Sequence, residues 1–405
     1  MLSKTFGADV HRDLTVVTKL GDEGKETRSF GVDPESLHKC VDWLQADGCM
    51  DGVMESTGVY WVPIYTTLKD AGLNVCVANA YQVKAIPGRK SDVKDSEWLA
   101  YLHRAELIKP SYIPDKNYQD LRTLTRLRTR LAETETDFKN RAHKILQLSN
   151  IRLASKLSKL FGGSGLRILE TLLNGGNINE AIKASDKRIQ AKGEEVKASI
   201  IGTLSQTDIF ELRIILENIK LLQTQIGQVD EKISTLVDSE LVSKLSRIPG
   251  VAPTSAYTLI AEIADPNRFE NEKRIAGCFG LAPSRYQSAR KDRHGHITKQ
   301  GSAWIRRIAT QCAKAASKSK SHLAQSYSRI AGRRGTAIAT TALARQIVTL
   351  AWDTIRTGRE YSEEHYVKKT KYRTKPGNAE KLNLNQISSI LGQATGIINP
   401  HAGCW

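Results

Sequence analysis

The first hundred residues alternate apolar and polar side chains with the period of strands, interrupted by segments with the spacing of helices. Segments that predict strands are residues 4–10, 14–20, 26–32, 51–57 and 74–80. Segments that predict helices are residues 34–48, 60–72 and 92–107. This order, three strands followed by alternating helices and strands, indicates an α/β domain in which helices pack on a mixed sheet.

After residue 113 the apolar spacing becomes helical, and in two places it repeats every seven residues. The first repeat comprises Leu124, Leu131, Phe138 and Ile145. The second comprises Leu212, Ile215, Ile219, Leu222, Ile226, Val229, Ile233 and Leu236. Such repeats favour coiled-coil packing. The two helices could pair with each other within one chain or across a dimer, and residues 151–206 read as short helices with glycine breaks.

The composition favours a polyanionic partner. Sixty Lys and Arg against 43 Asp and Glu give a formal net charge of +17, a surplus typical of proteins that bind nucleic acid, although a membrane surface is an alternative. The N-terminus has no apolar segment of signal-peptide length, and Arg345 interrupts the longest apolar stretch, residues 336–352. We therefore expect a cytoplasmic protein, whose six scattered cysteines are reduced.

Four carboxylates fall where the predicted sheet could gather them. Asp9 lies in the first strand, Glu55 ends the fourth, and Asp92 and Asp95 begin the last helix, three residues apart and so on one face. Clustered carboxylates need cations, and two Mg²⁺ ions would suit phosphoryl transfer on nucleic acid. Alternatively, Asp92 caps the helix and Asp95 interacts with its dipole. The metal-site hypothesis gains weight because aspartate is disfavoured inside a strand.

These positions resemble a known family, the insertion-sequence transposases with a DEDD catalytic tetrad, described as bridge-RNA-guided recombinases. The matching segments are "GADVHRD", "ESTGVYW" and "GRKSDVKDSEWLA". The resemblance implies an N-terminal RNase H-like domain of the RuvC type, with Asp9, Glu55, Asp92 and Asp95 as catalytic metal ligands. It also implies DNA as substrate, a structured guide RNA, and a homodimer or tetramer.

A second segment, residues 248–308, is similar to the family's second domain, which carries a serine nucleophile. The resemblance assigns that role to Ser288, with Ser284 as the alternative, and Ala289 stands where the family usually has glycine. Without the family, a serine beside arginines is more often an ordinary phosphate contact. Arginine and lysine neighbours would stabilise an alkoxide and a pentavalent phosphate.

Basic residues are dense around this serine. Residues 285–334 hold 13 Lys or Arg and one acid, a density suited to phosphate contacts, although a solvated basic face would look the same. The candidate nucleic-acid contacts are Arg285, Arg290, Lys291, Arg293, Lys299, Arg306 and Arg307. Upstream, residues 245–263 resemble a helix-hairpin-helix whose turn could hold a phosphate, or else a purely structural turn.

The sequence predicts four regions. They are an α/β RuvC-like catalytic domain (1–112), an α-helical coiled-coil insertion (113–240), a mostly α-helical C-terminal transposase domain (241–362) and a polar tail (363–405). We expect a recombinase that cuts and rejoins DNA with Mg²⁺ and a serine nucleophile. The alternatives are a junction resolvase or nuclease that uses the tetrad alone, and a non-enzymatic nucleic-acid-binding assembly protein.

Overall fold

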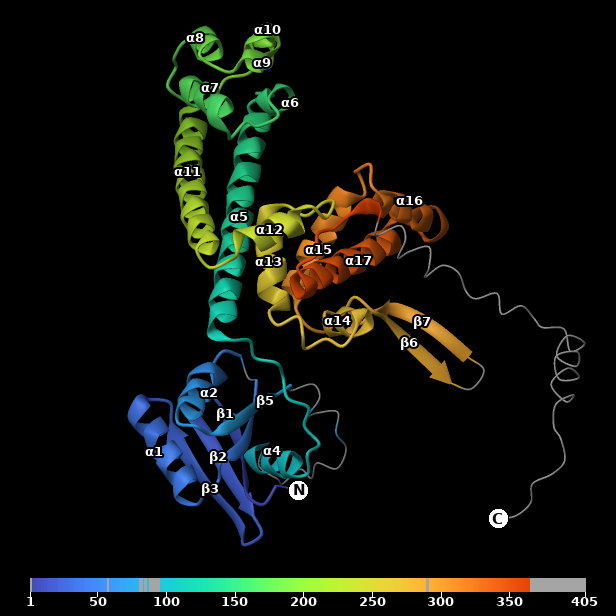
Figure 1. Ribbon diagram of the computed structural model, residues 1–405. Helices are drawn as coiled ribbons and strands as arrows, with labels where there is room; N and C mark the ends of the chain where they lie inside the picture. Colours follow the sequence, from blue (N-terminus) through green and yellow to red (C-terminus); the bar gives the residue numbers. More distant parts are fainter. Residues whose placement is uncertain are drawn as a thin grey trace, which may run out of the picture. The chain divides into compact units, whose positions relative to one another are not determined.

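The computed structural model describes residues 2–56, 58–79, 83, 86, 95–288 and 291–364, with the side chains of 285–294 left out (Figure 1). The predicted Asp92, Arg290 and C-terminal tail beyond residue 364 lie outside this part of the chain. The chain divides into two compact units, Met1–Ile113 and Pro114–Trp405. Among the described helices, none is both long and apolar enough to cross a membrane.

The first unit is a five-stranded sheet with helices on both faces. Its strands are β1 (Thr5–Val10), β2 (Leu14–Gly21), β3 (Gly24–Gly31), β4 (Asp51–Glu55) and β5 (Asn74–Ala78). Its helices are α1 (Pro34–Ala46), α2 (Trp61–Asp70) and α4 (Asp95–Arg104). The element order predicted from the alternation of side chains is confirmed.

The sheet is mixed, and β1 lies at its centre. The strand order is β3-β2-β1-β4-β5; β1 to β3 pair antiparallel, whereas β4 runs parallel to both β1 and β5. Helices α1 and α2 cover one face, where Leu44 and Ile64 pack with Phe6 and Ala8. Helix α4 covers the other face, where Leu99 and Leu102 pack with Val53.

Helix α4 approaches β1 closely because residue 7 is glycine. A Cβ atom at Gly7 would stand 2.1 Å from the carbonyl oxygen of Ser96 and 2.4 Å from the backbone nitrogen of Ala100. Beneath the helix, the hydroxyls of Thr18 and Ser96 are 2.8 Å apart, and the Thr5 hydroxyl donates to the Ala100 carbonyl. These buried hydrogen bonds satisfy polar groups that would otherwise be costly to bury.

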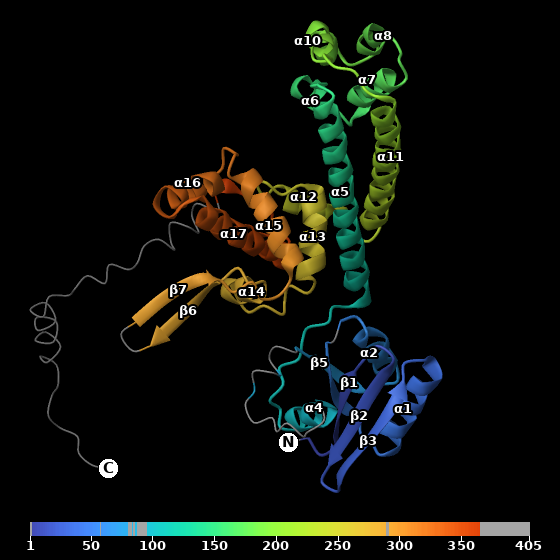
Figure 2. The same cartoon turned by 180° about the vertical axis from the view of Figure 1, so that it is seen from behind.

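The second unit begins with two long helices that lie side by side and antiparallel (Figures 1 and 2). They are α5 (Lys116–Leu148) and α11 (Gln206–Ser234), and between them come the short helices α6 (Leu153–Lys156), α7 (Gly163–Leu173), α8 (Ile178–Lys183), α9 (Lys187–Gln190) and α10 (Gly193–Ala198). The pairing is therefore made within one chain, which was one of the two alternatives.

The seven-residue repeat of α11 is largely buried, as a helix seam requires. The buried members are Leu212, Ile215, Ile219, Leu222 and Ile233. The last predicted member does not belong to the seam, because α11 ends at Ser234 and Leu236 is 43% exposed. The seven-residue spacing in the sequence extends beyond the end of α11, and Leu236 lies in the turn that leads to the next helix.

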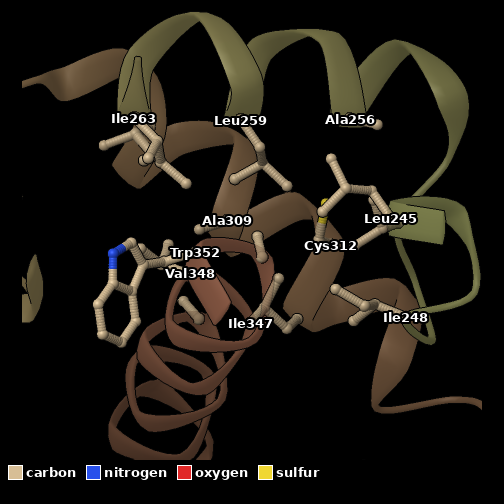
Figure 3. Packing of buried hydrophobic residues seen from close by; sticks show 14 of the residues in the cluster. Leu245, Ile248, Ala256, Leu259, Ile263, Ala309, Cys312, Ile347, Val348 and Trp352 are labelled. Carbon is tan, nitrogen blue, oxygen red and sulfur yellow. The ribbon is translucent and has the colours of Figure 1, made fainter. Parts of the chain in front are cut away.

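The rest of the unit is a helical domain with one two-stranded ribbon. Its helices are α12 (Ser239–Ser246), α13 (Pro253–Ile263), α14 (Glu272–Cys278), α15 (Ala303–Ala316), α16 (His322–Arg334) and α17 (Thr336–Thr357). Helices α12, α13, α15 and α17 pack around Leu245, Leu259, Cys312, Ile347 and Trp352 (Figure 3). The strands β6 (Pro283–Ser288) and β7 (Lys291–Ile297) form the ribbon, which is the non-helical part of a domain predicted to be mostly helical.

A buried carboxylate joins α5 to this domain. Glu262 of α13 is 1% exposed, and its Oε1 lies 2.8 Å from Nη2 of Arg126. Arg122, also on α5, donates to the backbone carbonyls of Ala261 and Glu262 near the end of α13. Because a buried charge is stable in a fold when it is paired, these two arginines fix the position of α5 on α13.

We expect Gly7→Ala to destabilise the first unit by about 3 kcal/mol, because the added methyl group collides with the backbone of α4 rather than with a movable side chain. The loss of stability is measured by denaturant unfolding, with hydrogen exchange of the backbone amides in β1 and α4 as the reporter. Gly227→Ala is the matched control: it lies in α11 with open space around the new methyl, so it should raise stability by up to about 1 kcal/mol. Equal stability of the two variants would contradict the packing described for α4.

Arg126→Ala should lower the free energy of unfolding of the second unit by about 3 kcal/mol, since it leaves the Glu262 carboxylate buried without its nearest cation. Arg130→Ala is the control. Both arginines lie over the ring of Trp304, 5.7 and 5.9 Å from its centroid, so both variants lose that contact. Arg130, however, is exposed, and the ion-pair partners of Glu262 are Arg122 and Arg126. A similar midpoint for the two variants in thermal unfolding would argue against the role of the ion pair.

Candidate functional site

Asp9 and Glu55 lie at the carboxyl ends of two adjacent parallel strands. Ala8 of β1 is paired with Met54 of β4, and each carboxylate is the next residue along its strand. Because side chains alternate between faces, Asp9 shares the face of Gly7, which is the face that α4 covers. The carboxyl ends of parallel strands are where α/β proteins usually carry functional groups.

Helix α4 begins near this end of the sheet. Ala100 of α4 lies beside Thr5, and Ser96 lies beside Gly7, so the helix runs antiparallel to β1. Its first residue, Asp95, therefore lies toward the end of β1 that carries Asp9. Asp95 is exposed. The helix therefore brings a third predicted carboxylate to the same end of the sheet, while the fourth, Asp92, is outside the described residues.

The described carboxylates do not by themselves form a metal centre. Within the part of the chain that the structure describes, no three His, Cys, Asp or Glu side chains are close enough to hold one ion. Their chemistry nonetheless fits a hard divalent cation, since all the predicted donors are carboxylate oxygens, which Mg²⁺ prefers.

A histidine that the sequence analysis did not select contacts Asp9. Nε2 of His11 lies 3.1 Å from Oδ2 of Asp9, whose side chain is 21% exposed. The signal was present in "GADVHRD": residues two apart in an extended segment point the same way. His11 therefore orients one oxygen of Asp9.

In the second unit, the two candidate serines lie on β6 of the ribbon. Ser288 is the last residue of β6 and is paired with Lys291, the first residue of β7. The Oγ atom of Ser284 donates a 2.9 Å hydrogen bond to the carbonyl oxygen of His296 across the ribbon. The two serines thus differ in position: the hydroxyl of Ser284 is engaged by the backbone of β7, whereas Ser288 is the last residue of its strand.

The predicted nucleic-acid contacts are distributed along and below this ribbon. Arg285, Lys291 and Arg293 belong to its strands, where the structure describes the backbone. Lys299 is exposed at the base of the ribbon and has a positive φ of 56°. Arg307, on α15, forms an ion pair with Glu133 of α5.

Arg306 occupies a structural position at the base of the ribbon. Its Nη1 donates to the carbonyl oxygens of Gln300 at 2.7 Å, Gly301 at 3.0 Å and Phe279 at 3.3 Å. Burial lowers the pKa of this guanidinium, but three carbonyl acceptors favour its charged form. The interactions tie the segments on both sides of the ribbon together.

The predicted helix-hairpin-helix comprises α12, a turn and α13. Gly250 in the turn has a φ of +85°, and a Cβ atom there would stand 2.3 Å from the carbonyl oxygen of Cys312 on α15. The glycine is therefore required for packing of the turn against α15. Ala252, the residue that precedes α13, is exposed, so the start of α13 is accessible from solvent.

Comparison with known proteins finds transposases along most of the chain. Residues 6–151 match a transposase family profile for the DEDD group of IS110, and residues 242–329 match the profile described as the IS116/IS110/IS902 transposase family. The Sinorhizobium fredii protein y4pF/y4sB is 30% identical over 183 residues, which span 44% of this chain and 46% of that protein.

Two further relatives match over longer spans. The protein named "Probable family 20 transposase" of Pseudomonas aeruginosa is 22% identical over 74% of this chain and 82% of its own. The transposase for insertion sequence element IS1111A of Coxiella burnetii is 21% identical over 77% of each chain. The solved structure of T. thermophilus RuvC in complex with Holliday junction substrate aligns to 27% of this chain with 11% identity and a TM-score of 0.21, too low to establish a common fold.

The first family match covers the first unit and continues through α5 of the second unit, and the second match lies within the second unit. The two matches lie in the expected order and together cover more than half of the 405 residues. Both describe the same group of proteins, as do the longer relatives. The chain is therefore a member of the IS110 family of insertion-sequence DNA transposases.

Proposed function

We propose that this transposase cuts DNA strands and rejoins them through a covalent protein–DNA intermediate, with the first unit as its metal-dependent RuvC-like part and Ser288 as its nucleophile. The observation that carries the proposal is the arrangement of Asp9 and Glu55 at corresponding positions on adjacent parallel strands, on a chain whose family is defined by transposases. A sheet end that gathers carboxylates suits phosphoryl transfer better than a purely structural role.

In this scheme Asp9, Glu55, Asp92 and Asp95 would hold the metal, which we infer to be two Mg²⁺ ions. When bound, such ions polarise a phosphoryl oxygen and offset its developing charge. The contribution of the chain is to present oxygen donors in fixed directions: the sheet fixes Asp9 and Glu55, α4 fixes Asp95, and His11 orients Asp9.

Ser288 would attack the phosphorus of a DNA phosphodiester. A bond forms between Oγ and phosphorus, the bond from phosphorus to one sugar oxygen breaks, and the serine proton is balanced by the proton that the leaving oxygen takes up. The product is again a phosphodiester, with serine in place of one DNA sugar oxygen. A second DNA hydroxyl can therefore attack the same phosphorus, release the serine and rejoin the strands. Lysine and arginine residues of the ribbon favour approach of the negative phosphate.

The partners follow from charge and from the family resemblance. A net charge of +17 supports binding of polyanions, and we propose DNA as substrate together with a structured RNA that selects the DNA sites. The proposed protein–nucleic acid contacts are Arg285, Arg290, Lys291, Arg293, Lys299 and Arg307. We assign Arg306, the remaining predicted contact, a structural role instead, because its Nη1 donates to backbone carbonyls at the base of the ribbon. We further propose that the active assembly is a homodimer or tetramer.

Asp9→Asn should abolish strand cleavage while DNA affinity and the unfolding midpoint stay near those of the unchanged protein, because a neutral amide is a poor ligand for Mg²⁺. Cleavage of labelled element ends across a Mg²⁺ titration measures this. Asp13→Asn is the control, since Asp13 is 86% exposed and pairs with Arg12 rather than with the site. Undiminished cleavage by Asp9→Asn would refute the metal assignment.

Ser288→Ala should eliminate any denaturation-resistant protein–DNA adduct and all strand rejoining, with DNA binding retained. The adduct is detected with nicked element-end DNA, and peptide mapping of the unchanged protein locates the modified residue. A DNA-modified peptide centred on Ser284 would move the nucleophile to that residue. Efficient cleavage by the unchanged protein without any adduct would instead favour a nuclease that uses the carboxylates alone.

A further inference from the structure

The β6–β7 ribbon contains a bulge near its base, formed by residues that the proposed mechanism does not use. Pro283 is paired with Ile297, and the next pair is Arg285 with His294. One residue of β6, Ser284, therefore stands opposite two residues of β7, Gly295 and His296. We call these three residues the Ser284 bulge. Bulges of this kind redirect the strand beyond them.

The contacts of the bulge explain why it forms here. The Ser284 hydroxyl donates to the His296 carbonyl at 2.9 Å, so the extra residue has a hydrogen-bond partner. A Cβ atom at position 295 would stand 2.4 Å from the Ser284 Oγ atom, and glycine leaves the space that this hydroxyl occupies. Serine at 284 and glycine at 295 thus suit each other, as glycine within a strand often marks such an approach.

The bulge determines which residue stands opposite the end of β6. With the bulge, Ser288 is paired with Lys291 and Gln287 with Asp292. If the pairing of Pro283 with Ile297 continued without a bulge, Gln287 would pair with Arg293, and Ser288 with Asp292. A shift by one residue also moves side chains to the other face of a strand. The choice is therefore between a cation and an anion opposite the proposed nucleophile.

We propose that Ser284 is a positioning residue: its hydrogen bond to His296 holds the Ser284 bulge, which keeps Lys291, and not Asp292, opposite Ser288. The catalytic consequence rests on the proposed function of Ser288, whereas the effect of the bulge on strand register is independent of it. A lysine opposite the serine attracts the phosphate that is to be attacked, and an aspartate would repel it.

The register can be measured by disulfide trapping in the full-length protein. Facing residues of antiparallel strands have Cα atoms about 4.5 or 5.5 Å apart, within the range of a disulfide, so paired cysteines report the register. One variant carries Gln287→Cys with Asp292→Cys, and a second carries Gln287→Cys with Arg293→Cys. Peptide mass spectrometry after equilibration with oxidised glutathione gives the crosslinked fraction of each and separates it from reactions of the exposed Cys278.

We expect the 287–292 crosslink to dominate when the bulge is intact. Ser284→Ala, and independently Gly295→Ala, should raise the ratio of the 287–293 to the 287–292 crosslink by about fivefold, the shift that one net hydrogen bond supports. Ser284→Thr keeps the hydroxyl and should restore the original ratio. An unchanged ratio in both Ser284→Ala and Gly295→Ala would overturn the proposal.

The same variants test the catalytic consequence. Without engineered cysteines, Ser284→Ala should reduce the protein–DNA adduct by about fivefold at unchanged DNA affinity, and Ser284→Thr should recover it. A loss of adduct without a change in crosslink ratio would refute positioning through the register. If the crosslink ratio shifts but the unchanged protein forms no adduct, the register device stands and the proposed role of Ser288 fails.

Discussion

The close contact between β1 and α4 is the constraint on which the candidate acidic site depends. Backbone atoms of Ser96 and Ala100 occupy the space that a side chain at position 7 would need, so α4 can lie on the sheet because that residue is glycine. With α4 fixed by Thr5 and Thr18 beneath it, its first residue comes to the end of the sheet that carries Asp9 and Glu55. A glycine two residues before a carboxylate thus contributes to the site through packing alone.

Part of the large positive charge is used inside the second unit and is not available to nucleic acid. Arg122 and Arg126 neutralise and surround a buried glutamate, and Arg306 binds three carbonyl oxygens below the ribbon. The number of basic residues in the sequence is therefore larger than the number whose charge is available to a phosphate backbone. The ribbon and its base carry most of the proposed phosphate contacts.

Local patterns predicted the elements, but not the contacts that depend on backbone geometry. The strands and helices of the first unit follow from alternation and helical spacing. So does the location of Asp9, Glu55 and Asp95 on those elements, whereas Asp92 lies outside the described residues. Heptad spacing could not decide whether α5 and α11 pair in one chain, because the same seam serves either arrangement. The position of Arg306 was not predictable, since its acceptors are backbone carbonyls that every residue carries. The bulge opposite Ser284 was missed because a register shift of one residue leaves composition and spacing unchanged.

The core of the second unit joins residues that are synthesised far apart in time. Leu121 of α5 and Ile233 of α11 share one apolar cluster with Trp352 of α17, and the Trp352 indole donates to the Pro266 carbonyl. The first unit, in contrast, is complete at residue 113. During translation the sheet can therefore fold while the later helices are still being made, because domains generally fold as units from the N-terminus. Leu121 of α5 must wait for α17, and during this interval the nascent chain leaves this apolar side chain open to aggregation and to chaperones.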